Sequence, residues 1–376
     1  MPTGGTSVKV LVQPGDGAAP IVQAIDEAKS TIQIIIFRFD ETEIERALAK
    51  AVDRGVRVQA LIAHVNGSGE DNLRKLELRL LADGVTVART ADRLARYHAK
   101  LMIVDRHDLY LFGFNLTHHD IDRSRSFGAI IDTPALVQEA IKVFEADVHR
   151  HTYEAGNRKL IVSPSNSRKE LAAFLEDAQR ELLIYDPKIS DPAMIRLLEA
   201  RRKDGVEIRI IGTVTRKSSK LTARKMPQMR LHTRTMIRDR KTAFIGSQSL
   251  RTMELDGRRE VGAILDDPSA VKRLTAIFDS DWELAGQPGR EEAGEEAPAA
   301  LVARKVAKAV AKELPPVAPV VEDMIREIAG KDTVELNTQK VEDTLRDAVK
   351  EAVKVAVQDV VEEAVDREVN GDHGDD

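Results

Sequence analysis

Two short segments of the chain place a histidine two residues before a cation. Residues i and i+2 of a strand share a face, so each imidazole should point the same way as its cation. One imidazole can attack phosphorus and a second can protonate the departing oxygen, while fixed cations hold the non-bridging oxygens. This pairing predicts metal-independent chemistry on a phosphodiester. The predicted catalytic set comprises the residues at matching offsets in both segments: His98, Lys100, Asp105, His232, Arg234 and Asp239.

A single His-x-Lys on a strand usually reflects ordinary packing. Here the pattern occurs twice, at the same place in an internal repeat, with an aspartate at the same offset. Each half predicts a helix, a buried strand, a second helix ending at a glycine, a strand, two strands joined by a tight turn, and a last strand. The first half adds a helix and strand over 71–88, which either insert at the mouth of the site or form a structural cover. Apolar strands alternating with helices predict an α/β sheet covered on both faces.

The repeated segments resemble the paired H-x-K-x-x-x-x-D signatures of the phospholipase D superfamily, over roughly residues 8–285. That superfamily includes phospholipases D, cardiolipin and phosphatidylserine synthases, and nucleases. The resemblance implies two similar α/β sandwich domains in tandem, related by pseudo-twofold symmetry, with the site between them. The predicted parts are a first domain, a second domain, an acidic flexible linker and an amphipathic helical tail, over 1–155, 156–285, 286–298 and 299–370.

The flanking residues resemble the family pattern with departures. Arg234 replaces the usual lysine, Ser249 an asparagine, and Ser126 a carboxylate that could orient an imidazole. Because the first motif is intact, His98 is the expected nucleophile and His232 the general acid, with the reverse order and an inactive phosphate-binding scaffold as alternatives. The two motif aspartates are expected to fix loops or form ion pairs across the cleft. The predicted substrate-binding residues flank the motifs: Gly113, Asn115, Ser247, Ser249 and Glu260.

The predicted substrate is an anionic phospholipid, which the enzyme would hydrolyse or use for phosphatidyl transfer, with nucleic acid as the alternative. A basic run over 216–230 leads to His232 and predicts a phosphate-binding rim, whereas scarce aromatic residues disfavour base stacking. Metal binding by His118, His119 and Asp120 is less favoured than an exposed loop. The sequence therefore predicts no metal and no cofactor.

The composition separates a basic body from an acidic tail. From residue 287 onward there are 12 basic and 22 acidic residues, so the tail carries −10 and the body +5 of the net charge of −5. The absence of cysteine excludes disulfides and thiolate sites, and the first residues lack the apolar core of a signal peptide. These features favour a cytoplasmic protein with peripheral contact at the inner face of the membrane. The tail helices are expected to rest on anionic membrane or to pack in a homo-oligomer.

Overall fold

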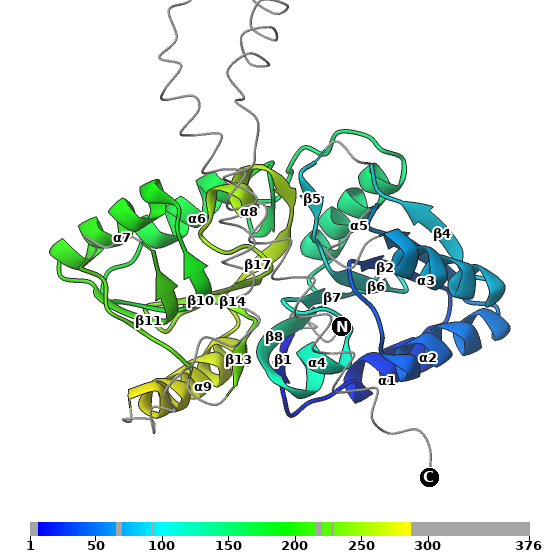
Figure 1. The fold of residues 1–376 in the computed structure, drawn as a ribbon, viewed down its shortest axis with the longest axis horizontal. Helices are drawn as coiled ribbons and strands as arrows, with labels where there is room; N and C mark the ends of the chain where they lie inside the picture. Colours follow the sequence, from blue (N-terminus) through cyan, green and yellow to red (C-terminus); the bar gives the residue numbers. More distant parts are fainter. Residues whose placement is uncertain (1–6, 65–69, 92–93, 216–219, 227–228, 287–376) are drawn as a thin grey trace, which may run out of the picture. The chain divides into compact units, whose positions relative to one another are not determined.

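Two mixed β-sheets form the framework of the protein (Figure 1). The computed structural model describes residues 7–64, 70–91, 94–215, 220–226 and 229–286. The predicted linker and tail, apart from residue 286, lie outside these described residues. We call the part before residue 156 the first lobe and the part from 156 to 286 the second lobe. The boundary between them stays a prediction.

The two sheets have the same strand order, which confirms the repeat. The first runs β4-β3-β2-β6-β7-β8-β1 and the second β12-β11-β10-β14-β15-β17-β9. In each, the first three strands are parallel and the others antiparallel. The bounds are, for the first sheet, Thr86–Arg89, Arg57–Ile62, Thr31–Ile36, Leu101–Val104, Asp108–Phe112, Ser124–Ile131 and Val8–Gln13, and for the second, Ala223–Arg224, Glu207–Val214, Glu181–Ile189, Arg234–Arg238, Thr242–Gly246, Val261–Leu265 and Leu160–Val162.

The helices follow the same repeat. The predicted helices of both halves and the inserted helix and strand are confirmed within a few residues, whereas α5, α9 and the edge strands β1 and β9 were not predicted. Helix α5 packs on β6 and β7, and α9 packs on β14 and β15.

None of the described helices is both long and apolar enough to cross a bilayer. The bounds are α1 Ala19–Glu27, α2 Thr42–Asp53, α3 Glu70–Ala82, α4 His118–Asp122, α5 Pro134–Val148, α6 Ser167–Glu176, α7 Pro192–Lys203, α8 Thr252–Asp256 and α9 Pro268–Gly286.

The lobes share a hydrophobic core. Successive side chains of a strand point to opposite faces. In β10, Leu183 and Tyr185 belong to the large apolar cluster that fills the first lobe, whereas Leu182 and Ile184 belong to a smaller cluster within the second. One face of the second sheet therefore packs into the core that it shares with the first lobe. This shared core fixes the lobes against each other, as a site built from both requires.

Two short strands cross between the lobes directly before the motif histidines. Strand β5, Arg96–Tyr97, pairs in parallel with β16, Arg258–Arg259, of the second lobe. Strand β13, Arg230–Leu231, of the second lobe pairs in parallel with β8 of the first (Figure 1). Each motif histidine therefore follows a segment whose backbone is held by the opposite lobe.

The motif aspartates close the tight turns after β6 and β14. Asp105 and Asp239 have φ of 51° and 52°, in the left-handed region. Residues other than glycine adopt this region at a steric cost, which local hydrogen bonds can compensate. The Asp105 carboxylate accepts hydrogen bonds from the backbone N–H groups of Lys29, Ser30 and Thr31, at 2.7–2.9 Å. Asp239 accepts in the same way from the backbone N–H groups of Gln179 and Arg180, just before β10, and of Glu181, its first residue. Each aspartate thus ties its hairpin to the first residues of the adjacent strand.

We expect Asp105→Asn to lower the free energy of unfolding by about 2 kcal/mol, because an amide cannot replace a carboxylate that accepts several backbone hydrogen bonds. Burial raises the pKa of Asp105, but the hydrogen bonds from the backbone N–H groups lower it by more. The net effect is a pKa below the ordinary aspartate value. This stabilisation is present above the ordinary aspartate pKa and is lost as the pH falls through the lowered value. Urea unfolding at neutral and acidic pH measures both effects. The exposed Asp53→Asn is the control, and equal losses in the two variants would contradict the assignment.

Candidate active site

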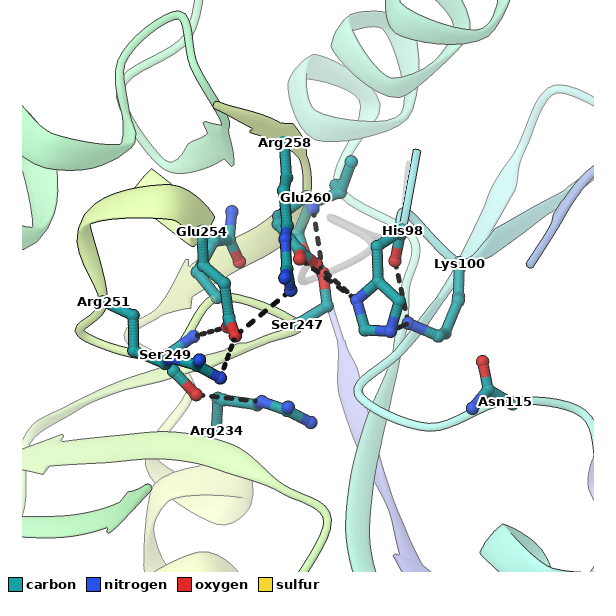
Figure 2. Close-up of polar contacts among 12 residues, drawn as sticks. His98, Lys100, Asn115, Arg234, Ser247, Ser249, Arg251, Glu254, Arg258 and Glu260 are labelled. Atoms are coloured by element: carbon teal, nitrogen blue, oxygen red, sulfur yellow. Dashed lines mark hydrogen bonds and ion pairs between the residues drawn. The ribbon is translucent and has the colours of Figure 1, made fainter. Parts of the chain in front are cut away.

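The first motif histidine, His98, is held by groups of both lobes. Its backbone N–H donates to the Arg259 carbonyl at 2.8 Å, and its Nδ1 lies 2.8 Å from Glu260 Oε2 of the second lobe (Figure 2). Lys100 Nζ lies 3.0 Å from His98 Nε2 and also donates to the His98 carbonyl. An ammonium group only donates, so we assign Nε2 as the acceptor and Nδ1–H as the donor to Glu260. This tautomer directs the Nε2 lone pair to the side where Lys100 lies.

The second motif histidine, His232, is held in the mirrored way. Its backbone N–H donates to the Arg125 carbonyl of the first lobe at 3.0 Å. Its Nδ1 lies 2.9 Å from Asp120 Oδ2, and Asp120 also accepts from Arg230 at 2.7 Å and from both nitrogens of Asn115. Each imidazole is therefore oriented by a carboxylate of the opposite lobe. The carboxylate missing at Ser126 is supplied by Asp120.

Asp120 is the functional residue that sequence reasoning missed in this role. It lies in α4, whose Thr117 N-cap side chain accepts from the Asp120 N–H. The sequence held a signal for it, because a carboxylate stands five residues after Asn115 and another, Glu254, five residues after Ser249. Its neighbour His118 faces Glu41 at 2.9 Å, so these side chains do not converge on a metal. Among the described residues, no His, Asp and Glu cluster is arranged to hold a metal ion.

Burial and charge keep both imidazoles neutral in the free protein. Burial lowers the pKa of His98 well below its usual value, and the cations Lys100, Arg234, Arg258 and Arg96 lower it further. Burial also lowers the pKa of His232 to about 4, although Asp120 opposes the shift. The pKa of Asp120 is lowered because His232, Arg230 and the Asn115 N–H outweigh its desolvation. Asp120 is thus ionised beside His232, whereas His98 is surrounded by cations.

The two motif cations, Lys100 and Arg234, are close enough to interact electrostatically. Burial lowers the pKa of Lys100 to about 7, and Arg234 of the other lobe lowers it as well, which places both cations in one electrostatic environment. Arg234 Nε donates to Ser249 Oγ at 3.2 Å, and Figure 2 shows Arg234 on the second-lobe side of His98 and Lys100. The serine in place of asparagine thus accepts a hydrogen bond from the arginine in place of lysine. The two departures from the family pattern are in direct contact.

The structure places the remaining predicted substrate-binding residues at or around the site. Asn115 lies at the site, and its Oδ1 is buried without a hydrogen-bond partner in the described part of the chain. Ser247 is fully buried, its Oγ hydrogen-bonds the Val261 backbone, and it lowers the pKa of Glu260, so it supports the segment that carries this carboxylate. A side chain on Gly113 would meet the Phe127 carbonyl at 2.7 Å, so this glycine permits a close backbone approach. These positions are those of supporting groups.

The two motif aspartates of the predicted catalytic set lie apart from the motif histidines. Asp105 follows β6 and Asp239 follows β14, whereas each motif histidine precedes the same strand, so the aspartates lie at the far ends. Their carboxylates are occupied by backbone N–H groups. The expectation that they fix loops fits these contacts, and ion pairing across the cleft does not describe them.

Part of the predicted basic rim has other partners. The Arg224 guanidinium lies 3.9 Å from the Trp282 ring centroid and donates to the Trp282 carbonyl, so it packs against α9. Arg230 is bound by Asp120. Residues 216–219 and 227–228 lie outside the described residues. The rim therefore stays a prediction, with these two arginines as its exceptions.

We expect sulfate affinity to fall roughly tenfold from about pH 6 to about pH 8.5, the loss of one charge-assisted hydrogen bond. Lys100, whose pKa is about 7, is charged below this pH and neutral above it. Burial and Glu254 raise the pKa of Glu260 to about 8, so this carboxyl gains a negative charge over the same range. Isothermal titration with sulfate, whose own charge is constant here, measures the effect. Lys100→Met should bind weakly with a flatter profile, and an unchanged profile would contradict the assignment.

Comparison with known proteins supports the resemblance to phospholipase D-like proteins. A family model described as "Cardiolipin synthase, PLD-like domain" matches residues 21–148 and 171–282. A search of curated proteins found no match. The polyphosphate kinase of Porphyromonas gingivalis has a similar fold, with a TM-score of 0.62, 18% identity and coverage of 73% of this chain. This chain covers 50% of that kinase, about half of its length.

A second similar structure is the phosphatidylserine synthase of Haemophilus influenzae Rd KW20. Its TM-score is 0.55 at 12% identity, and the match covers 74% of this chain and 86% of that one. These likenesses show the fold, namely two phospholipase D-like α/β domains in tandem. The family model matches both halves of the repeat, including both histidine motifs. The chain therefore belongs to the phospholipase D-like family, and both halves match the family model of the cardiolipin synthase-type domain.

Proposed function

We propose that the protein is a phosphodiesterase or phosphatidyltransferase that acts on phospholipids through a covalent phosphohistidine. The supporting observation is the pair of buried imidazoles, each tied at Nδ1 to a carboxylate of the opposite lobe, with Lys100 and Arg234 beside them. This arrangement offers a nucleophile, an acid and phosphate-binding cations without requiring a metal.

In this proposal His98 is the nucleophile. Its Nε2 is unprotonated, and the cations around it favour the neutral ring. Nε2 forms a bond to phosphorus as the bond from phosphorus to the leaving alcohol oxygen breaks. Glu260, in its ionised form, accepts the hydrogen bond from Nδ1–H and stabilises the positive charge that develops on the ring. Lys100 moves from Nε2 to a non-bridging oxygen, where the transferring group needs charge stabilisation.

His232 is then the general acid and base. The negative charge of a bound phosphodiester, together with ionised Asp120, favours the imidazolium form of His232. This ring protonates the leaving alcohol oxygen. In the second step neutral His232 takes a proton from an incoming hydroxyl, whose oxygen attacks phosphorus as the bond to His98 breaks. Water as the acceptor gives hydrolysis, and an alcohol or lipid hydroxyl gives transfer.

Lipid is favoured over nucleic acid by the placement of the aromatic side chains. Proteins that bind single-stranded nucleic acid stack bases on accessible aromatic rings. All four tyrosines and eight of the nine phenylalanines of this chain are buried. The single tryptophan, Trp282, is covered by Arg224 and stacks with Phe278. Among the described phenylalanine, tyrosine and tryptophan side chains, only Phe39 and Trp282 are partly exposed, which disfavours a base-stacking surface.

We expect His98→Gln to abolish turnover and His232→Gln to lower it by about 10²- to 10⁴-fold. With bis(p-nitrophenyl) phosphate, whose leaving group needs no protonation, His232→Gln should still release the first phenolate. Mass spectrometry of rapidly quenched enzyme should then show the acid-labile adduct on His98. The exposed His107→Gln is the control. An adduct on His232 in the wild type would reverse the assignment.

Substrate class is tested with the full chain in EDTA. Vesicles containing labelled phosphatidylglycerol and plasmid DNA are offered in parallel, with and without glycerol as an acceptor. Release or exchange of the lipid headgroup supports the proposal, and DNA cleavage alone identifies the nuclease alternative. Binding without turnover of either substrate points to the inactive scaffold.

We expect Asp120→Asn to act on His232 and not on the nucleophile. The variant should lower kcat for substrates with alkyl leaving groups by about tenfold or more, because an amide orients the ring but does not favour its charged form. Release of the first phenolate from the p-nitrophenyl ester should change little. Because His232 must be protonated to act as the acid, the alkaline limb of the pH–rate profile for the alkyl substrates should also move to lower pH. Equal losses with both substrates would indicate a merely structural role.

A further inference from the structure

We propose that Arg96 and Arg258 form a subsite for a second phosphate group of the substrate, beside the phosphate that reacts at His98. This inference rests on the proposed function and narrows its substrate class. The preferred substrate would carry an additional phosphate on the alcohol or acyl-bearing part next to the reacting phosphodiester. The arginines come from different lobes, so the subsite exists only in the assembled fold.

Strand pairing places the two arginines side by side. Strands β5 and β16 are parallel, with Arg96 opposite Arg258 and Tyr97 opposite Arg259. Tyr97 Oη and Arg259 both bond the Asp147 carboxylate, at 2.6 and 2.9 Å. Because successive side chains alternate between faces, Arg96 and Arg258 face away from Asp147. They lie on the same side as one another.

That side is the one on which the reacting imidazole lies. His98 is two residues after Arg96, and Glu260 is two residues after Arg258, so alternation predicts that all four share a face. The contact of 2.8 Å between His98 and Glu260 agrees with this. Figure 2 shows Arg258 beside Glu260 and close to His98. Both arginines also act electrostatically on His98.

One phenylalanine ring lies near both Arg96 and the motif lysine Lys100. The Phe37 ring lies edge-on to His98, with 4.5 Å between the ring centroids. The Arg96 guanidinium carbon lies 5.5 Å from the Phe37 centroid, and Lys100 Nζ lies 5.4 Å from the same point. Arg96 and Lys100 therefore flank one small apolar ring. Two linked phosphates can be held by two such neighbouring cations.

Two adjacent arginines are unfavourable unless an anion lies between or beside them. Like charges directly opposite each other on neighbouring strands destabilise the pairing. Arg258 is 17% exposed at its side chain and has Glu254 Oε1 at 3.5 Å, a distance that leaves only a weak ion pair. Glu254 is also engaged by Arg251 at 3.2 Å. One carboxylate thus serves two arginines.

The other half of the repeat shows the arrangement without this pair. There, Arg230 takes the place of Arg96 and lies opposite Ser124, which takes the place of Arg258. Arg230 is bound by Asp120 at 2.7 Å, so its charge is balanced. The repeat has therefore gained an additional arginine only on the His98 side. The arginine pair that faces His98 therefore has no counterpart at the corresponding positions before His232.

Equilibrium binding tests the subsite without relying on turnover. Isothermal titration of the full chain compares glycerol 3-phosphate with glycerol bisphosphate. Wild type should bind the bisphosphate on the order of tenfold more tightly, the effect of one charge-assisted contact. Arg258→Gln and Arg96→Gln should each remove most of that preference and change binding of the monophosphate little. The exposed Arg57→Gln is the control. A preference that survives both site variants would overturn the inference.

Kinetics identify the source of the second phosphate. Phosphatidylglycerol is compared with phosphatidylglycerol phosphate, and a nucleoside p-nitrophenyl phosphodiester is compared with its analogue that carries a further phosphate. A lower KM for the lipid with the second phosphate, lost in Arg258→Gln, supports the subsite in a lipid enzyme. The same result with the nucleotide pair alone supports the subsite and overturns the lipid substrate. Turnover without any preference, in wild type and variants alike, rejects the subsite but retains the proposed function.

Folding defects are separated by a charge-retaining variant. Arg258→Lys keeps the positive charge and should retain part of the bisphosphate preference, whereas Arg258→Gln should not. Both variants are compared with wild type by thermal unfolding. If Arg258→Gln is unfolded, the result with Arg258→Lys and Arg96→Gln decides: wild-type preference in both would overturn the proposal.

Discussion

The close contact between Nδ1 of each buried imidazole and a carboxylate of the opposite lobe is the interaction on which the site depends. A buried polar ring without a partner is costly, and a freely rotating ring would not direct Nε2 at phosphorus. Glu260 and Asp120 remove both problems for His98 and His232. Because each pair crosses between the lobes, neither lobe contains a complete site. The shared core and the crossing strands therefore serve the chemistry directly.

The two halves satisfy this constraint with residues from different places in the repeat. The carboxylate for His98 comes from the segment after β16, whereas the carboxylate for His232 comes from α4. At the position corresponding to Glu260 the first lobe has Ser126, and at the position corresponding to Asp120 the second lobe has Glu254. This exchange makes the environments unequal. His232 faces ionised Asp120 and His98 faces cations, a difference that suits the acid and nucleophile roles proposed for them.

A separate set of cross-lobe ion pairs carries the scaffold. Arg259 binds Asp147 of α5, and Arg125 binds Asp281 of α9, at corresponding positions of the repeat. These pairs lie on the faces of the crossing strands opposite the histidines. The lobes are thus joined by one layer of structural contacts and one of reactive groups. Substitutions in the first layer should act through folding, and those in the second through charge and orientation.

The sequence alone determined the repeat, most elements and both His-x-cation motifs, because these depend on spacing and local periodicity. It also indicated that a carboxylate was missing at Ser126. It could not show that Asp120 fills this role, or that Ser249 accepts from Arg234, because those partners meet only through packing of distant segments. The crossing strands, only two residues long, have no detectable period. Only the tertiary structure could place Arg96 beside Arg258, since their proximity is created by pairing between lobes.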